Sequence, residues 1–189
     1  MQPQPGYVYY ISDDYFNDVD DPCLMRNKSD GHKRPYYCCK QSEETGLYWM
    51  IPLSSQTLKF RDRFARSISK YGNCIGLVLG QFGGRNAAFL VQNAFPITEN
   101  YVKEVFKINE NPVPVHSKLQ RIIYGKLQGS LAIHRKGYHT FYTDIDKDQY
   151  VMLQKRNERK PGLESMIAAA KKKQEKGFHS TPPLLCTER

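Results

Sequence analysis

Residues Arg34–Leu53 read RPYYCCKQSEETGLYWMIPL, and this stretch decides the fold. Two runs rich in aromatic and apolar residues, Arg34–Gln41 and Leu47–Leu53, flank the polar segment Ser42–Gly46, which ends in glycine. This pattern predicts a β-hairpin with a five-residue loop. Pro35 stands near the start of the first strand, where a missing N–H is tolerated. We therefore expect an antiparallel sheet built around this hairpin.

Other segments predict the elements that surround the hairpin. The run Val8–Ser12 is aromatic and β-branched, which predicts a strand, and Asp13 and Asp14 can begin a short helix after it. Apolar residues recur every three or four positions in Leu58–Tyr71 and in Val115–Leu131, which predicts two amphipathic helices. Further strands are expected at Ile75–Leu79, at Ala87–Gln92 across a glycine-rich turn over Gly80–Asn86, and at Tyr150–Leu153.

Strands in hairpins with helices between them indicate the α+β class. We expect a compact antiparallel β-barrel-like sheet with inserted helices. Residues 1–153 are expected to form one domain, and residues 154–189 a basic C-terminal extension. That extension is distinct in composition, because residues 151–189 hold nine basic and only four acidic side chains.

Composition limits the function classes. The net charge is +9, which suggests an anionic partner, most commonly nucleic acid, although a soluble protein that is merely basic is an equally good interpretation of the charge alone. No apolar run approaches the roughly 18 residues of a membrane span, and the start MQPQPGYVYY does not look like a secretory signal. We therefore expect a cytoplasmic protein without membrane partners. Five cysteines without metal-ligand spacing predict reduced thiols and no zinc site. We also expect no other metal and no cofactor.

Common catalytic signatures, such as a phosphate-binding loop or a zinc-protease motif, are missing from the sequence. One group of polar residues stands out instead, because Lys33 enters the hairpin while Ser54 and Ser55 leave it, with Lys59 following. Antiparallel pairing brings these two ends together. Ammonium and hydroxyl groups on one surface suit metal-free RNA cleavage, in which the 2′-hydroxyl of the RNA attacks the adjacent phosphate. From these residues alone, an ordinary loop with solvated lysines is the more common interpretation.

Four motifs in a fixed order resemble the ToxN/AbiQ toxins of type III toxin–antitoxin systems, including the TenpN-like and CptN-like branches. The opening strand and its following tyrosine are matched by Tyr9–Tyr15, and the lysine that enters the hairpin by Lys33–Tyr37. The Pro-Leu-Ser-Ser loop with a downstream lysine is matched by Ile51–Lys59, and the long helix by Lys118–Gln128. The likeness spans roughly residues 7–150 and leaves the C-terminal extension without a counterpart.

The resemblance implies a fold, an activity and a partner. The fold is a compact PemK/MazF-like barrel decorated with helices. The activity is sequence-preferring, metal-independent cleavage of single-stranded RNA that leaves a 2′,3′-cyclic phosphate, which makes residues 1–153 a toxin RNase domain. The partner is an RNA antitoxin of pseudoknot repeats that inhibits the toxin in a closed protein–RNA hetero-oligomer, as part of phage defence.

By matching positions, the resemblance also implies site residues. The candidates for the active site are Tyr15, Lys33, Ser54, Ser55 and Lys59. Separately from the matched positions, we expect an electrostatic track for RNA on basic and aromatic residues near the hairpin and on the two long helices: Arg34, Arg61, Arg63, Arg66, Lys118, Arg121, Tyr124 and Lys126. Two alternatives stay open, a non-catalytic RNA-binding protein and a PemK/MazF-like toxin with a protein antitoxin.

Overall fold

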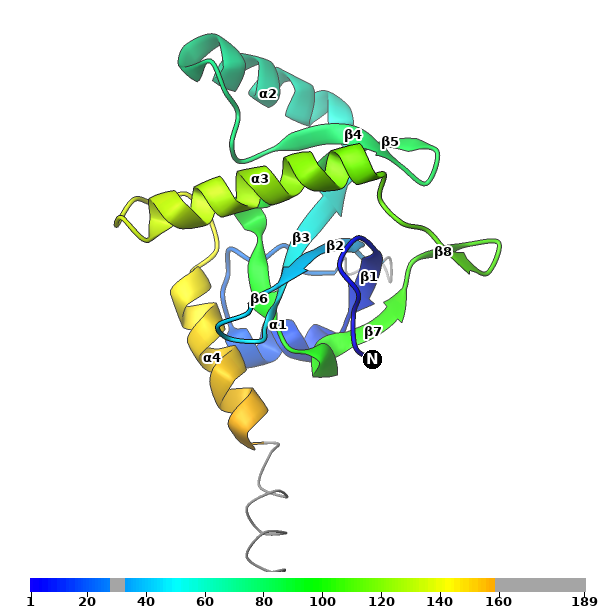
Figure 1. Ribbon diagram of the computed structural model, residues 1–189, viewed down its shortest axis with the longest axis vertical. Coiled ribbons are helices and arrows are strands. Elements are labelled where there is room, and N and C mark those ends of the chain that lie inside the picture. The colour runs from blue at the N-terminus through cyan, green and yellow to red at the C-terminus, as the bar shows by residue number, and fades with distance from the viewer. Residues whose placement is uncertain (28–32, 159–189) are drawn as a thin grey trace, which may run out of the picture. The chain divides into compact units, whose positions relative to one another are not determined.

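The computed structural model describes residues 1–27 and 33–158 (Figure 1). The chain divides into two compact units, Met1–Leu153 and Gln154–Arg189. Only residues 154–158 of the second unit are described, so the predicted basic C-terminal extension lies almost entirely outside the described residues. Among the described residues, no helix has both the length and the apolar character required to cross a membrane.

The first unit is organised by an antiparallel sheet in the order β4-β5-β3-β2-β1-β7, with β6 also paired to β3. The strands are β1 (Val8–Ile11), β2 (Tyr36–Gln41), β3 (Tyr48–Ser54), β4 (Val78–Phe82), β5 (Arg85–Phe89), β6 (Phe95–Ile97) and β7 (Val102–Val105). A small hairpin, β8 (Lys107–Ile108) and β9 (Asn111–Pro112), follows β7. The α+β class with inserted helices is confirmed, but the sheet is not a closed barrel. Its two edge strands, β4 and β7, do not pair in the described part of the chain.

The predicted hairpin is confirmed as β2–β3, the pair of strands at the centre of the sheet. Tyr36 pairs with Pro52 and Gln41 with Tyr48, and Gly46 adopts the left-handed conformation (φ 68°) that closes the loop. Ten of the thirteen residues of these two strands are buried. The reason is that both faces of this hairpin are covered. Strands covered on both faces have nearly continuous apolar sequences instead of alternating apolar and polar residues.

Two hydrophobic clusters lie on the two faces of β2–β3. Successive side chains alternate between them, so Cys38 joins one cluster and Cys39 the other. One cluster contains Tyr37, Trp49 and Ile51 together with the long helix α3 (Ser117–His134). The other contains the aromatic residues of the helix α1 (Asp13–Val19) and Met152 of α4 (Ile145–Glu158). All four described cysteines are free, as the sequence predicts.

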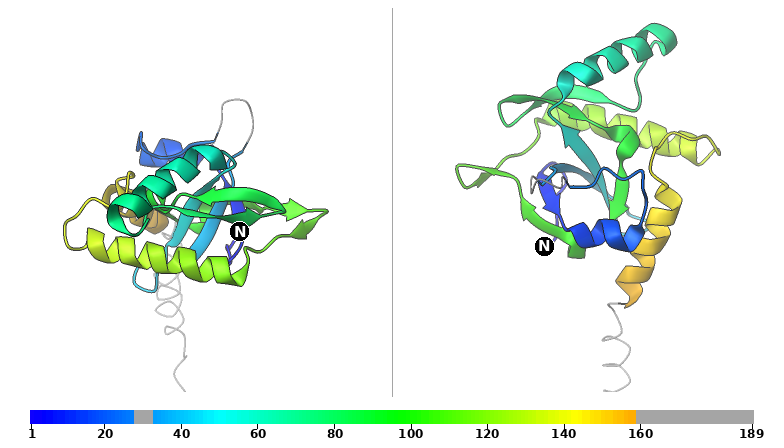
Figure 2. Two further views of the ribbon diagram at one scale, coloured as in Figure 1. Left: turned by 90° about the horizontal axis from the view of Figure 1, so that it is seen from above. Right: turned by 180° about the vertical axis from the view of Figure 1, so that it is seen from behind.

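The helix α2 (Thr57–Tyr71) packs less completely than its sequence suggests. It ends as predicted, with Gly72 in the left-handed conformation (φ 68°) and its N–H donating to the Ile68 carbonyl at 2.8 Å. However, only Phe60 of its apolar residues is buried, and Tyr71 is 69% exposed. The helices α2 and α3 lie on opposite sides of the β4–β5 hairpin (Figure 1; Figure 2). An extended, basic face of α2 is therefore open to solvent.

Three sequence predictions are wrong. The turn predicted over Gly80–Asn86 is only Gly83–Gly84, because both glycines take positive φ (58° and 75°) and let the strands continue to a two-residue turn. The strand predicted at Tyr150–Leu153 lies inside α4. This helix begins where the Asp144 carboxylate accepts a hydrogen bond from the Lys147 N–H at 3.1 Å.

The third error concerns the helix predicted over Val115–Leu131, whose sequence predicts one apolar stripe of Leu119, Ile122, Ile123, Leu127 and Leu131. Ile123, Leu127 and Leu131 are buried as predicted, whereas Ile122 is 43% exposed. Ile122 and Ile123 are adjacent, and a helix turns by about 100° per residue, so both cannot face the same core. Two short 3-10 helices, Val91–Asn93 and Glu99–Tyr101, complete the described elements.

Candidate active site

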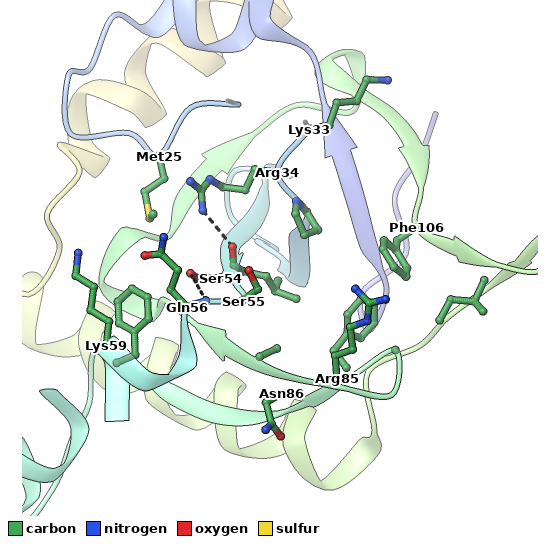
Figure 3. A pocket seen from close by; sticks show the side chains of 17 residues that line it. Met25, Lys33, Arg34, Ser54, Ser55, Gln56, Lys59, Arg85, Asn86 and Phe106 are labelled. Atoms are coloured by element: carbon green, nitrogen blue, oxygen red, sulfur yellow. Dashed lines mark hydrogen bonds between the residues drawn. The ribbon is translucent and has the colours of Figure 1, made fainter. Parts of the chain in front are cut away.

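A pocket of about 870 Å³ opens where β2 begins and β3 ends (Figure 3). Its walls come from the residues before β2, the β3–α2 connection, the β4–β5 hairpin and the segment after β7. The polar lining residues are Lys33, Arg34, Ser54, Ser55, Gln56, Lys59, Arg85 and Asn86. The apolar walls include Met25, Phe60, Phe82, Phe106 and Ile108. Four cations and two serine hydroxyls thus share one cavity.

Backbone pairing explains why these residues meet. The Leu53 N–H donates to the Pro35 carbonyl at 3.0 Å, which places the residue before Pro35 beside the end of β3. On its other side β3 pairs with β5, with Ser54 opposite Ala88. The start of β5 therefore approaches the serines from a second direction. The sequence prediction that the two ends of the hairpin meet is correct.

Arg34 is the most firmly held cation of the pocket. Its guanidinium donates to the carbonyls of Leu53 at 3.2 Å and Arg26 at 3.3 Å, and its backbone N–H donates to the Asn27 side-chain oxygen at 3.0 Å. No carboxylate pairs with Arg34 in the described part of the chain. Carbonyl groups fix the orientation of a guanidinium without cancelling its charge, so Arg34 stays available to an anion.

The serines join β3 to α2. Ser54 is half-buried, and its hydroxyl oxygen accepts a hydrogen bond from the Gln56 N–H at 3.2 Å, which leaves its O–H free to donate. Ser55 is exposed. The helix α2 begins directly afterwards with no side-chain cap and no acidic residue in its first turn. Its N-terminal N–H groups add a partial positive charge at this end of the pocket.

The two predicted lysines are placed differently. Lys59 lies in the first turn of α2 and lines the pocket. Lys33 also borders the pocket, but its ammonium group forms an ion pair with Glu104 at 3.0 Å. Figure 3 shows the Lys33 side chain directed away from Ser54 and Ser55. Both groups of this ion pair are exposed, so it contributes little to stability.

Sequence reasoning missed Arg85 and Asn86, which it assigned to the end of the turn predicted over Gly80–Asn86. They are the first residues of β5 and line the pocket opposite Arg34 (Figure 3). A usable signal was present, because two adjacent glycines between alternating residues mark a two-residue hairpin turn. That turn makes Arg85 a strand residue paired with Phe82.

Tyr15 is not part of the pocket. The residue is 0% exposed, its hydroxyl donates to the Pro96 carbonyl at 3.1 Å, and its ring stacks on Phe95 with centroids 4.9 Å apart. Burial raises the pKa of Tyr15 well above its ordinary value. A fully buried ring has no face to offer an RNA base, so the expectation of an active-site Tyr15 is replaced by a core position.

The predicted RNA-binding residues do not form one continuous track. Arg63 and Arg66 line a second cavity along α2. Exposed side chains outside both cavities are Arg61, Lys118, Arg121 and Tyr124. Lys126 has an internal role, since its ammonium donates to the Cys74 carbonyl and to the Asn73 side-chain oxygen at 3.2 Å.

The described lining of the pocket contains no aspartate, glutamate or histidine. Elsewhere among the described residues, no three His, Cys, Asp or Glu side chains gather as metal ligands would. The donor set of the pocket is ammonium, guanidinium, amide and hydroxyl groups, which bind phosphate oxygens well. The pocket is therefore suited to a phosphodiester with an apolar group, such as a base, against its aromatic wall.

Comparisons with known proteins agree on the fold. No protein-family model and no curated protein matches the sequence. The structure is similar to that of AbiQ, a lactococcal anti-phage endoribonuclease of the type III toxin–antitoxin system, at TM-score 0.54 and 10% identity, covering 79% of this chain and 98% of that chain. It is also similar to a bacterial type III toxin that is inhibited selectively by a non-coding RNA pseudoknot, at TM-score 0.52 and 17% identity, covering 84% and 99%. The chain therefore has the fold of the type III toxin–antitoxin toxins, as its resemblance to the ToxN/AbiQ family predicts.

Proposed function

We propose that this protein is the toxin of a type III toxin–antitoxin system, a metal-independent, sequence-preferring endoribonuclease inhibited by a repeated pseudoknot RNA. The pocket carries the proposal, because Arg34, Lys59 and Arg85 surround the hydroxyls of Ser54 and Ser55, and no aspartate or glutamate is among the described lining residues. The shared fold with AbiQ, an endoribonuclease, supports the same conclusion.

The proposed reaction uses the RNA as its own nucleophile. The 2′-oxygen forms a bond to the adjacent phosphorus while the bond from phosphorus to the 5′-oxygen breaks. The 2′-hydroxyl loses its proton and the departing 5′-oxygen gains one, which leaves a 2′,3′-cyclic phosphate and a 5′-hydroxyl. The cations would stabilise the charge that grows on the phosphate oxygens in the transition state. The serine hydroxyls would orient the phosphate or assist the proton transfer.

The proposed inhibitor is an RNA, as in the second similar structure. An RNA inhibitor that occupies the cationic pocket would exclude the substrate, because both present a phosphodiester group to the same cations. The net charge of +9 favours such a polyanion over a neutral partner. Protein and RNA would assemble into closed hetero-oligomers in the cytoplasm.

Cleavage of single-stranded RNA by the purified protein in excess EDTA tests the enzymatic part. We expect fragments with cyclic phosphate ends, and a loss of roughly 100-fold or more in kcat/KM for Ser54→Ala combined with Lys59→Ala. The matched control is Lys103→Ala, which removes one exposed cation on β7 outside the pocket. Unchanged cleavage by the double variant would refute the site.

Two further results would favour the alternatives. Tight RNA binding without any cleavage would indicate a non-catalytic RNA-binding protein. The inhibitor is identified by sequencing whatever nucleic acid co-purifies with the protein expressed from its native locus, and a repeated RNA is expected. A small co-purifying protein in its place would indicate a PemK/MazF-like toxin with a protein antitoxin.

A further inference from the structure

A second cavity, of about 1130 Å³, runs along α2 and is called here the α2 groove. One wall is the α2 face and the other is the segment that follows α3. Between these walls lie the segment that leads into β4 and the residue Gln92. The lining residues are Lys59, Phe60, Arg63, Arg66, Ser67, Lys70, Tyr71, Asn73, Cys74, Ile75, Gly76, Gln92, His139, Thr140 and Tyr142. Lys59 lines both cavities, so the α2 groove adjoins the candidate active site.

The described lining residues of the α2 groove carry positive charge and no negative charge. Lys59, Arg63, Arg66 and Lys70 recur at intervals of four, three and four residues, which puts them on one face of the helix. None of the four pairs with a carboxylate in the described part of the chain, and no aspartate or glutamate is among the described lining residues. The four cations span roughly 16 Å at the helical rise of about 1.5 Å per residue.

Two exposed tyrosines stand among these cations. Tyr142 is 52% exposed, and the Arg63 guanidinium lies 5.1 Å from the centroid of its ring. At the far end of α2, the Lys70 ammonium lies 4.9 Å from the centroid of the Tyr71 ring. An exposed ring beside a cation can stack on a base while the cation contacts the phosphate.

The position of Tyr142 is fixed by its neighbours. Phe141 and Thr143 on either side are buried, and Thr143 donates its hydroxyl to the Ala94 carbonyl at 2.8 Å. The Tyr142 N–H donates to the Gln92 carbonyl at 2.8 Å, while the Gln92 N–H donates to the Gly76 carbonyl at 3.0 Å. The backbone of Gln92 thus ties the wall that carries Tyr142 to the segment that leads into β4. An exposed ring on a segment anchored in this way is set in place before any ligand arrives.

The floor of the α2 groove depends on a glycine. A Cβ atom at Gly76 would lie 2.6 Å from the side-chain oxygen of Gln92, closer than such atoms approach. Two hydrogen bonds connect the groove to α3: Lys126 donates to the Cys74 carbonyl in the segment that leads into β4, and Thr140, in the wall that follows α3, donates to the Ser130 carbonyl at 3.0 Å. Hydrogen bonds to α3 therefore fix the wall that follows α3 and the segment that leads into β4.

We propose that the α2 groove binds unpaired, single-stranded RNA, with bases stacked on Tyr142 and Tyr71 and phosphates held by Arg63, Arg66 and Lys70. Through Lys59 the strand continues into the candidate active site. The span of roughly 16 Å accommodates several stacked nucleotides at about 3.4 Å each. The proposal rests on the RNA specificity of the proposed function but not on cleavage.

Single-stranded RNA fits the groove better than the other polyanions. An acidic peptide would satisfy the cations but has no flat group for the two tyrosine rings. A duplex offers phosphates but keeps its bases stacked in the helix, away from both rings. Only an unpaired strand presents phosphates and free base faces together.

Fluorescence anisotropy with 2′-O-methyl RNA tests the proposal, because this RNA lacks the attacking hydroxyl and stays intact. We compare oligonucleotides of about 4 and about 12 nucleotides. Tyr142→Ala is expected to weaken binding of the long oligonucleotide roughly 5- to 100-fold and that of the short one little. Tyr142→Phe retains the ring and should bind normally. Tyr150→Ala, which removes a 64% exposed tyrosine outside both cavities, is the matched control.

Several outcomes would overturn the proposal: equal binding of the long oligonucleotide by Tyr142→Ala and the wild type, equal loss in Tyr150→Ala, or equal affinity for a duplex. A rise in KM for long substrates in Tyr142→Ala would show that the RNA bound in the α2 groove is the substrate. Weaker inhibition of Tyr142→Ala by the co-purified RNA would show that it is the antitoxin. A change in neither quantity would refute the proposed binding of RNA in the groove. Groove-dependent binding without cleavage would refute the proposed function alone, whereas cleavage insensitive to groove variants would refute only this inference.

Discussion

Tyr15 and Ser54 illustrate what decides the role of a single residue. Both were expected at the active site from their positions in the sequence motifs. Ser54 lies at the pocket because a strand ends there and its backbone must turn into α2. Tyr15 lies on the buried face of α1, where its ring contacts Phe16, Phe95 and Tyr101. The local sequence identifies a tyrosine after an acidic pair, but it does not show which face of the helix packs against the core.

The placement of Tyr15 leads to a prediction at this scale. Tyr15→Phe removes the hydroxyl that bonds the Pro96 carbonyl and leaves that acceptor buried without its partner. We expect a loss of about 1–3 kcal/mol in the free energy of unfolding. Denaturant unfolding measures this loss, and cleavage per folded molecule should match the wild type. A folded Tyr15→Phe protein with abolished cleavage would return Tyr15 to the active site.

The β4–β5 hairpin shows how a small element controls a site. The Gly83–Gly84 turn sets where β5 begins, and β5 carries Arg85 and Asn86 into the pocket. A longer turn would leave Arg85 on a loop without a fixed register. The position of this cation therefore depends on backbone conformations that glycine adopts without strain.

Substitution of Gly84 tests this dependence. Gly84 has φ 75°, and an added Cβ would meet no atom within 4 Å. The strain in Gly84→Ala therefore comes only from the left-handed backbone conformation and not from a steric clash. We expect a loss of about 1–2 kcal/mol in stability and reduced cleavage as Arg85 shifts. Gly125→Ala is the matched control, because it also meets nothing within 4 Å but lies inside α3, where alanine stabilises by up to about 1 kcal/mol. Equal melting temperatures for the two variants would contradict the argument.

For the molecule as a whole, a buried acidic cluster links α4 to the rest of the first unit. Asp148 is 0% exposed, and its carboxylate has no hydrogen-bond partner among the described residues. Burial, with Asp21 and Asp144 nearby, raises the pKa of Asp148 to about 8, against a smaller opposing effect of Lys147. Asp21 itself accepts hydrogen bonds from the Cys23 and Asp144 N–H groups at 2.7 and 2.9 Å. Folding therefore keeps a proton on Asp148 at neutral pH.

The consequence is a stability that falls as pH rises. Between the ordinary pKa of an aspartate, about 4, and the raised value, the folded chain binds one more proton at this site than the unfolded chain. This contribution to the free energy of unfolding is complete below pH 4 and is lost as the pH approaches 8, by at most about 1.4 kcal/mol per pH unit. Asp148→Asn cannot titrate, so its stability relative to wild type should increase from pH 5 to pH 8. Parallel stability curves for the two proteins over that range would show that Asp148 is already ionised in the fold.

The sequence by itself determined the antiparallel hairpin, the C-terminal end of α2, most of the buried stripe of α3 and the approach of the two hairpin ends at Pro35 and Leu53. These depend on local patterns of apolar residues, on turn glycines and on the pairing that a hairpin imposes. Tertiary structure decided the rest. It buried Tyr15, turned Lys33 toward Glu104, brought in Arg85, and placed Tyr142 opposite Arg63 across the α2 groove. The reason is that these contacts join segments distant along the chain, and only the packing of α1, α2 and the sheet fixes which faces meet.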